Sequence, residues 1–156
     1  MADTKYLSEA RGLLTLKRAA LGSLAERDGT TFPFVSLVLP ALSTEGAPLL
    51  LLSDLSDHAK NLKREPKASL LFDGTLELKE PLTGPRLTLI GEVSRSIDQA
   101  ADKALYLGQQ PSAEMYINFG DFHCFRFEMI EGLFVAGFGR IHRIAPQELL
   151  GERLAG

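Results

Sequence analysis

The stretch from Leu49 to Pro66, LLLLSDLSDHAKNLKREP, is an apolar run followed at once by a polar segment that ends at proline. The leucines predict a buried strand, and the polar segment predicts a short helix that Pro66 cannot continue. The junction gathers hydroxyl, imidazole, ammonium and amide groups, on Ser53, Ser56, His58, Lys60 and Asn61. Free N–H groups at the start of a helix add partial positive charge there, so the junction predicts a site for an anionic cofactor. The same pattern also fits a capped surface helix with a solvated polar face.

Composition predicts one globular domain over residues 1–156, because 45% of the residues are hydrophobic and 24% are charged. No apolar run approaches the ~20 residues that cross a bilayer, so we expect no membrane protein. A net charge of −3 with mixed signs gives no reason to expect a nucleic-acid partner. The single cysteine, Cys124, cannot form an internal disulfide, and the chain starts without a signal segment, so we expect a cytoplasmic protein.

Short apolar segments separated by turn residues predict a mainly β fold with peripheral helices. The expected strands are residues 19–25, 34–39, 49–52, 68–72, 86–93, 124–130 and 132–139, and the expected helices are residues 4–17, 59–64 and a segment that starts at Asp98. Asp28-Gly29 and Glu131-Gly132 are expected at hairpin turns. Six or seven strands of this kind favour a small closed antiparallel barrel, because closure removes exposed strand edges.

Four segments in this order resemble the FMN-binding split β-barrels, the relatives of pyridoxamine 5′-phosphate oxidase. They are the strand and helix that end in Asn61-Leu62 and Pro66, the segment 81–91, the triplet Gly120-Asp121-Phe122, and the segment 135–140. The last two make the chain most similar to the haem-utilisation (HugZ/HutZ-like) branch. The resemblance implies a split β-barrel and a homodimer with one FMN at each end of the subunit interface. Apolar segments around Leu37, Phe119 and Phe138 would need such cover.

The resemblance also implies roles for particular residues. Ser36 would contact the cofactor, Ser53 would lie beside the flavin ring, and Arg86 would reach the ring from a later strand. His58, Lys60 and Asn61 would bind the phosphate. The chain departs from the oxidases at one position, because Asp57 stands where their Ser-Arg-Lys motif has arginine. This removes a cation from the phosphate site.

Three functions remain open at this point. The first is an FMN-dependent oxidoreductase that acts on a small-molecule substrate, with the flavin supplying the redox chemistry. The second is a haem-binding or haem-degrading protein, for which His142 is the candidate axial ligand. The third is a cofactor-free barrel that binds a small ligand. No protein side chain is assigned a catalytic role, and no metal site is predicted apart from His142 if haem is bound, because the histidines lack metal-binding spacing.

Overall fold

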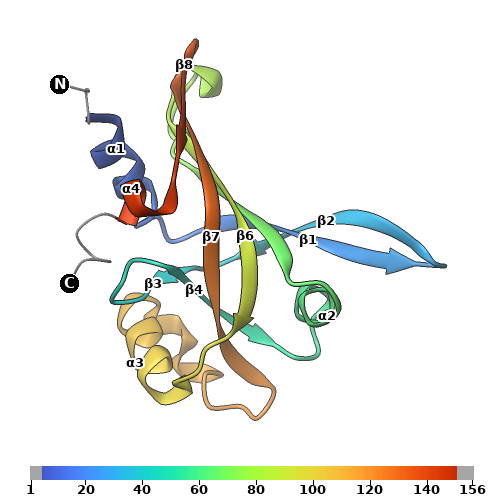
Figure 1. Cartoon of the computed structure of the whole chain (residues 1–156). Coiled ribbons are helices and arrows are strands. Elements are labelled where there is room, and N and C mark those ends of the chain that lie inside the picture. Colours follow the sequence, from blue (N-terminus) through green and yellow to red (C-terminus); the bar gives the residue numbers. More distant parts are fainter. Residues whose placement is uncertain (1–4, 151–156) are drawn as a thin grey trace.

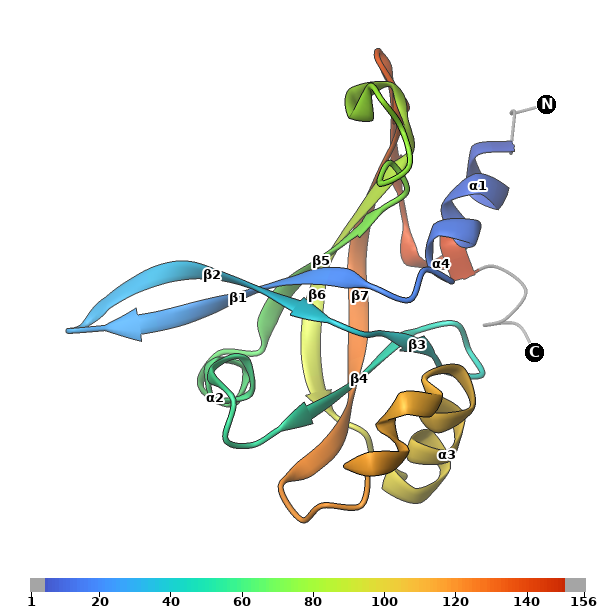
Figure 2. The same cartoon turned by 180° about the vertical axis from the view of Figure 1, so that it is seen from behind.

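One curled antiparallel sheet of eight strands forms the body of the computed structural model, which describes residues 5–150 (Figures 1 and 2). The strands run in the order β2-β1-β5-β6-β7-β4-β3, and β8 pairs with β7. They are β1 (Ala19–Arg27), β2 (Thr30–Val38), β3 (Ala41–Leu42), β4 (Pro48–Ser53), β5 (Lys67–Asp73), β6 (Arg86–Arg95), β7 (Phe122–Gly137) and β8 (Arg140–Ile144). The helices are α1 (Lys5–Leu13), α2 (Asp57–Arg64), α3 (Gln99–Gln109) and α4 (Pro146–Leu150), with short 3₁₀ turns η1 (Pro81–Thr83) and η2 (Pro111–Met115). Between residues 5 and 150, no helix is long and apolar enough to cross a membrane.

The predicted mainly β split barrel with few helices is confirmed, with two corrections. The strands number eight rather than six or seven. In the described part of the chain no ladder joins β2 to β3, so the barrel is split rather than closed. The predicted first helix ends at Leu13 rather than residue 17, and its expected start at Thr4 lies outside the described residues.

The predicted turn at Glu131-Gly132 is wrong, because β7 continues through it to Gly137. Glu131 pairs with Ile90 of β6, and the register shifts between Ile90 and Gly91. A β-bulge therefore absorbs one residue of β7 where the sequence suggested a reversal. The chain reverses later, at Gly139, whose φ is 72°, and returns as β8.

β4 explains why the leucine run is continuous rather than alternating. Leu50 and Leu52 belong to the core inside the barrel, which also contains Phe72, Phe127 and Phe134, whereas Leu49 and Leu51 belong to a second cluster beneath α3. Figure 2 shows α3 beside β3 and β4. Because both faces of β4 are covered, every position from Pro48 to Leu52 is buried.

The predicted turn at Asp28-Gly29 is confirmed. Both residues have positive φ, 51° and 77°, as a tight hairpin turn requires. The β1–β2 hairpin extends away from the rest of the molecule (Figures 1 and 2). Its outer strand β2 lies at the end of the sheet and exposes Val35 and Leu37.

Gly91 tests whether the bulge constrains the sheet. A Cβ at this position would collide with the carbonyl of Glu128 in β7, which is backbone and cannot move aside cheaply. We expect Gly91→Ala to lower the free energy of unfolding by about 1–3 kcal/mol, measured by urea denaturation. The matched control is Gly108→Ala on α3, where an added methyl group meets nothing within 4 Å. That change should stabilise slightly, and equal stability of the two variants would contradict the role given to the bulge.

Candidate functional site

A cleft of 360 Å³ lies where β2 and β4 end and α2 begins. Its lining is mostly apolar and aromatic: Leu37, Val38, Leu39, Leu51, Leu52, Ser53, Ser56, His58, Tyr106, Tyr116 and Phe122. No lysine or arginine from the described part of the chain is among these residues. Tyr116 and Phe122 form one aromatic wall, with ring centroids 4.9 Å apart.

The two serines of the cleft are engaged in local structure. Ser53 Oγ donates to Asp121 Oδ2 at 2.5 Å and accepts from the N–H of Leu55 at 3.1 Å. Ser56 Oγ donates to the Ser53 carbonyl at 2.6 Å and accepts from the N–H of Ala59 at 3.3 Å. Ser56 is therefore the N-cap of α2, as the capped-helix alternative supposed. Both hydroxyls are therefore already hydrogen-bonded to other groups of the same chain.

His58 is the polar side chain of the cleft that keeps one nitrogen available to bind a ligand. Its Nδ1 lies 2.9 Å from Ser36 Oγ, and within residues 5–150 its Nε2 makes no hydrogen bond. Partial burial lowers the pKa of His58 below its ordinary 6.5, and the nearby Asp57 carboxylate offsets this only in part. The side chain is therefore a neutral imidazole at pH 7, held at one nitrogen and open at the other, as a metal-ligating histidine is.

The other predicted cofactor residues do not converge on this cleft within one chain. Lys60 lines a different cleft, beside Arg95. Asn61 is buried and donates from Nδ2 to Ser23 Oγ at 3.2 Å. Arg86 pairs with Val135 near the far end of β7 and donates to the carbonyls of η1 and Gly84. Of the six predicted residues, Ser36, Ser53 and His58 come together.

The remaining histidines lie elsewhere. His123 Nδ1 is 3.1 Å from Asp54 Oδ2. His142, on β8, stacks on Tyr6 with ring centroids 4.1 Å apart and an angle of 7° between the rings. It pairs with Phe134, near the end of β7 opposite to Phe122, and lines a shallow pocket with Arg140. His142 is therefore not part of the cleft that contains His58.

The aromatic residues that line the cleft, Tyr106, Tyr116 and Phe122, were not predicted from the sequence as site residues, and neither was Asp121, the hydrogen-bond partner of Ser53. For Asp121 and Phe122 the sequence offered one signal, the triplet Gly120-Asp121-Phe122. It supported the family resemblance but assigned these residues no function.

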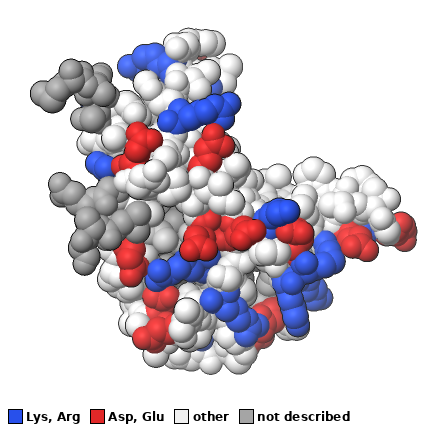
Figure 3. All heavy atoms as spheres, in the orientation of Figure 1, with Lys and Arg blue, Asp and Glu red and all other residues white. Residues whose placement is uncertain are grey.

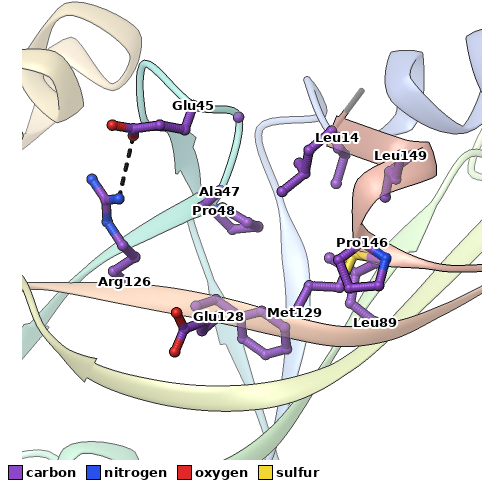
Figure 4. A pocket seen from close by; sticks show the side chains of 13 residues that line it. Leu14, Glu45, Ala47, Pro48, Leu89, Arg126, Glu128, Met129, Pro146 and Leu149 are labelled. Carbon is purple, nitrogen blue, oxygen red and sulfur yellow. Dashed lines mark ion pairs between the residues drawn. The ribbon is translucent and has the colours of Figure 1, made fainter. Parts of the chain in front are cut away.

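A smaller cavity of 240 Å³ lies under α4 (Figure 4). Its floor includes Leu89 and Met129, and its rim carries the Glu45–Arg126 ion pair at 3.3 Å. None of the predicted cofactor residues lines it.

Comparison with known proteins identifies the family. The sequence profile described as "CREG, beta-barrel" matches residues 4–150. The chain belongs to the CREG beta-barrel family. The resemblance to the split barrels of the haem-utilisation branch is thereby confirmed.

Two relatives carry names that refer to haem. The chain is 38% identical over 109 residues to the chloroplastic haem oxygenase HOZ of Arabidopsis thaliana, a match that covers 68% of this chain and 32% of that protein. It is 28% identical over 138 residues to the haem oxygenase HutZ of Vibrio cholerae, covering 81% of this chain and 75% of HutZ. The chain thus spans about a third of the length of the plant relative.

Solved structures agree with this placement. A haem-binding protein from Mycobacterium smegmatis superposes with a TM-score of 0.84 at 27% identity, covering 96% of this chain and 62% of that one. A protein of the pyridoxinephosphate oxidase family from Clostridium acetobutylicum has a TM-score of 0.71 at 18% identity, covering 95% and 99% of the two chains. The second likeness concerns the fold alone.

Asn61 distinguishes a structural role from a cofactor-binding role. Its amide and the Ser23 hydroxyl are both buried and hydrogen-bonded to each other. We expect Asn61→Ala to lower the free energy of unfolding by about 1–3 kcal/mol, because the Ser23 hydroxyl loses its partner, and to leave ligand affinity unchanged. Urea denaturation of both single variants and the double variant Ser23→Ala/Asn61→Ala measures the coupling. Unchanged stability combined with lost ligand binding would return Asn61 to the cofactor site.

Proposed function

We propose that this protein binds haem in the cleft at the β4–α2 junction, where His58 would ligate the iron. One observation carries the proposal: the cleft has apolar and aromatic walls, a neutral imidazole with an open nitrogen, and no lysine or arginine among the described residues that line it. A haem ring needs apolar walls, and ordinary haem ligation needs a side chain such as histidine. The names of HOZ, HutZ and the mycobacterial haem-binding protein support the same reading.

FMN is the second candidate, and the fold shared with the pyridoxinephosphate oxidase family favours it. The cleft fits the phosphate of FMN less well. A phosphate is bound best by charge-assisted hydrogen bonds, above all from arginine. Here the Ser53 hydroxyl is already hydrogen-bonded to Asp121, and the Ser56 hydroxyl to the Ser53 carbonyl and the N–H of Ala59. Lys60 and Arg86 lie outside the cleft. An FMN-dependent oxidoreductase would therefore need cations from a second copy.

The chain's own residues divide the work of holding haem. Ser36 Oγ, 2.9 Å from Nδ1, would orient the His58 ring, and by accepting a hydrogen bond from Nδ1–H it would leave Nε2 to ligate iron. Leu37, Tyr116 and Phe122 supply surface that excludes water from the ring. Bound haem supplies the iron and the oxygen chemistry. We extend the proposal to haem degradation, which the words haem oxygenase in the names of HOZ and HutZ support, and to the cytoplasmic location expected from the sequence.

A second copy of the chain completes the cleft in this proposal. Leu37 on the cleft wall is 66% exposed, and Phe119, whose ring centroid is 6.3 Å from that of Phe122, is 56% exposed. The edge strand β2 adds Val35 to the same uncovered region. Apolar residues on an unpaired edge favour association with another subunit. We therefore propose a homodimer with the ligand at the interface.

Haem titration tests the ligand. We expect haemin added to the apoprotein to give a shifted Soret band that His58→Ala abolishes and that added imidazole restores.

Ser36→Ala should weaken haem binding about 10-fold, because the Ser36 hydroxyl orients the His58 ring and does not itself ligate iron. The matched control is His142→Ala, which should change the affinity less than twofold. Because burial lowers the pKa of His58, protonation should compete with iron at lower pH than for an ordinary histidine, so haem affinity should fall as the pH drops below 6.5 and recover as it rises. Loss of the spectrum in His142→Ala but not in His58→Ala would refute the assignment, and a purified protein carrying flavin would favour FMN.

Sedimentation velocity tests the dimer. We expect the wild type to sediment as a dimer at micromolar concentration, and Leu37→Asp to sediment as a folded monomer, because a charge at an apolar interface is left unpaired. The control is Ile97→Asp, a fully exposed apolar residue in the turn after β6. A monomeric wild type would rule the dimer out.

A further inference from the structure

A second cleft lies on another face of α2 from His58. Its volume is 640 Å³, within the range of small-molecule sites. Its lining comes from α2, the end of β6, the start of β7 and the loop after β4: Asp54, Ala59, Lys60, Leu62, Lys63, Val93, Ser94, Arg95 and Phe125. Neither the comparisons nor the haem proposal assigns it a role.

Two lysines on the rim have uncompensated charge. Lys60 and Lys63 are exposed, lie one helical turn apart on α2, and form no ion pair with any residue between 5 and 150. Residues three positions apart on a helix are neighbours, so their like charges repel each other. Lys and Arg side chains gather over α2 and the adjacent end of β6 (Figure 3). An anion between the two lysines would relieve this repulsion.

Arg95 supplies a fixed cation on the opposite rim. Its Nη2 donates to Asp54 Oδ1 at 2.6 Å, and its guanidinium carbon lies 5.8 Å from the centroid of the Phe125 ring. Asp54 is itself 3.1 Å from His123. The remaining N–H groups of Arg95 make no hydrogen bond in the part of the chain that the structure describes. Three cations and one carboxylate therefore line the cleft, for a net charge of +2.

The floor of the cleft is apolar. Ala59, Leu62, Val93 and Phe125 are all less than 9% exposed and belong to the main core. Burial of these side chains makes the floor rigid, whereas the lysines above it are exposed. A ligand that fits must match both properties, with an apolar body below and negative charge above.

We propose that this cleft binds a small molecule with a flat apolar body and an anionic group, an aromatic carboxylate, sulfonate or phosphate. The apolar body lies over Leu62 and Phe125, and the anionic group lies between Lys60, Lys63 and Arg95. The site is separate from the cleft of His58, so the proposal does not rest on haem binding.

Two fluorescent probes with nearly the same aromatic framework test the site. Anilinonaphthalene sulfonate is anionic, and N-phenylnaphthylamine is neutral. We expect the double variant Lys60→Gln/Lys63→Gln to weaken binding of the anionic probe at least about tenfold at low salt and to change binding of the neutral probe less than twofold. The matched control is Lys67→Gln/Lys79→Gln, which removes two exposed lysines that do not line the cleft.

The outcomes separate this proposal from the haem proposal. His58→Ala should leave binding of the anionic probe unchanged, and the Lys60/Lys63 variant should leave the Soret band unchanged. Equal loss in the Lys67/Lys79 control would show a non-specific charge effect and overturn the site. Equal loss of the neutral probe would also overturn it. Loss of haem binding in the Lys60/Lys63 variant but not in His58→Ala would support the cationic cleft as the binding site and overturn the haem assignment to His58.

Discussion

The burial of β4 on both faces is the constraint on which the rest of the structure depends. Leu50 and Leu52 pack into the barrel while Leu49 and Leu51 pack under α3, so the strand is held from two sides. Its last residue, Ser53, is then fixed by Asp121 and by the start of α2. The position of the candidate haem cleft follows from that, because the cleft opens where this strand ends.

α2 directs side chains of different chemistry, which are neighbours in the sequence, toward different surfaces of the molecule. Asn61 and Arg64 attach the helix to β1, through Ser23 and the carbonyl of Leu24. His58 faces the apolar cleft, and Lys60 and Lys63 face the cationic one. Within eight residues the helix has one anchoring face and two that border clefts of opposite character. A neutral imidazole and free ammonium groups are kept apart because a helix turns about 100° per residue.

The parts of the fold that follow from local pattern were predictable from the sequence. The leucine run gave β4, Asp28-Gly29 gave the hairpin, and Asp98 caps α3 as expected. The turn predicted at Glu131-Gly132 is wrong because Gly132 is a packing residue rather than a turn residue. A Cβ at this position would lie 3.2 Å from the end of the Met129 side chain. The site was less predictable. The contact between Ser36 and His58 joins residues 22 positions apart and depends on strand register, and a polar helix residue such as Asn61 does not reveal locally that it faces the core.

β7 runs without interruption from Phe122 to Gly137, so its length sets the distance between the cleft and His142. Phe122 stands at the cleft, and Phe134, which pairs with His142, stands near the other end of the same strand. At about 3.3 Å per residue these positions are roughly 40 Å apart along the strand, shortened somewhat by its bulge and curvature. That separation is far greater than the diameter of a porphyrin. His58 and His142 of one chain are therefore too far apart to hold the same haem, and if these two residues did hold one haem they would have to come from two subunits.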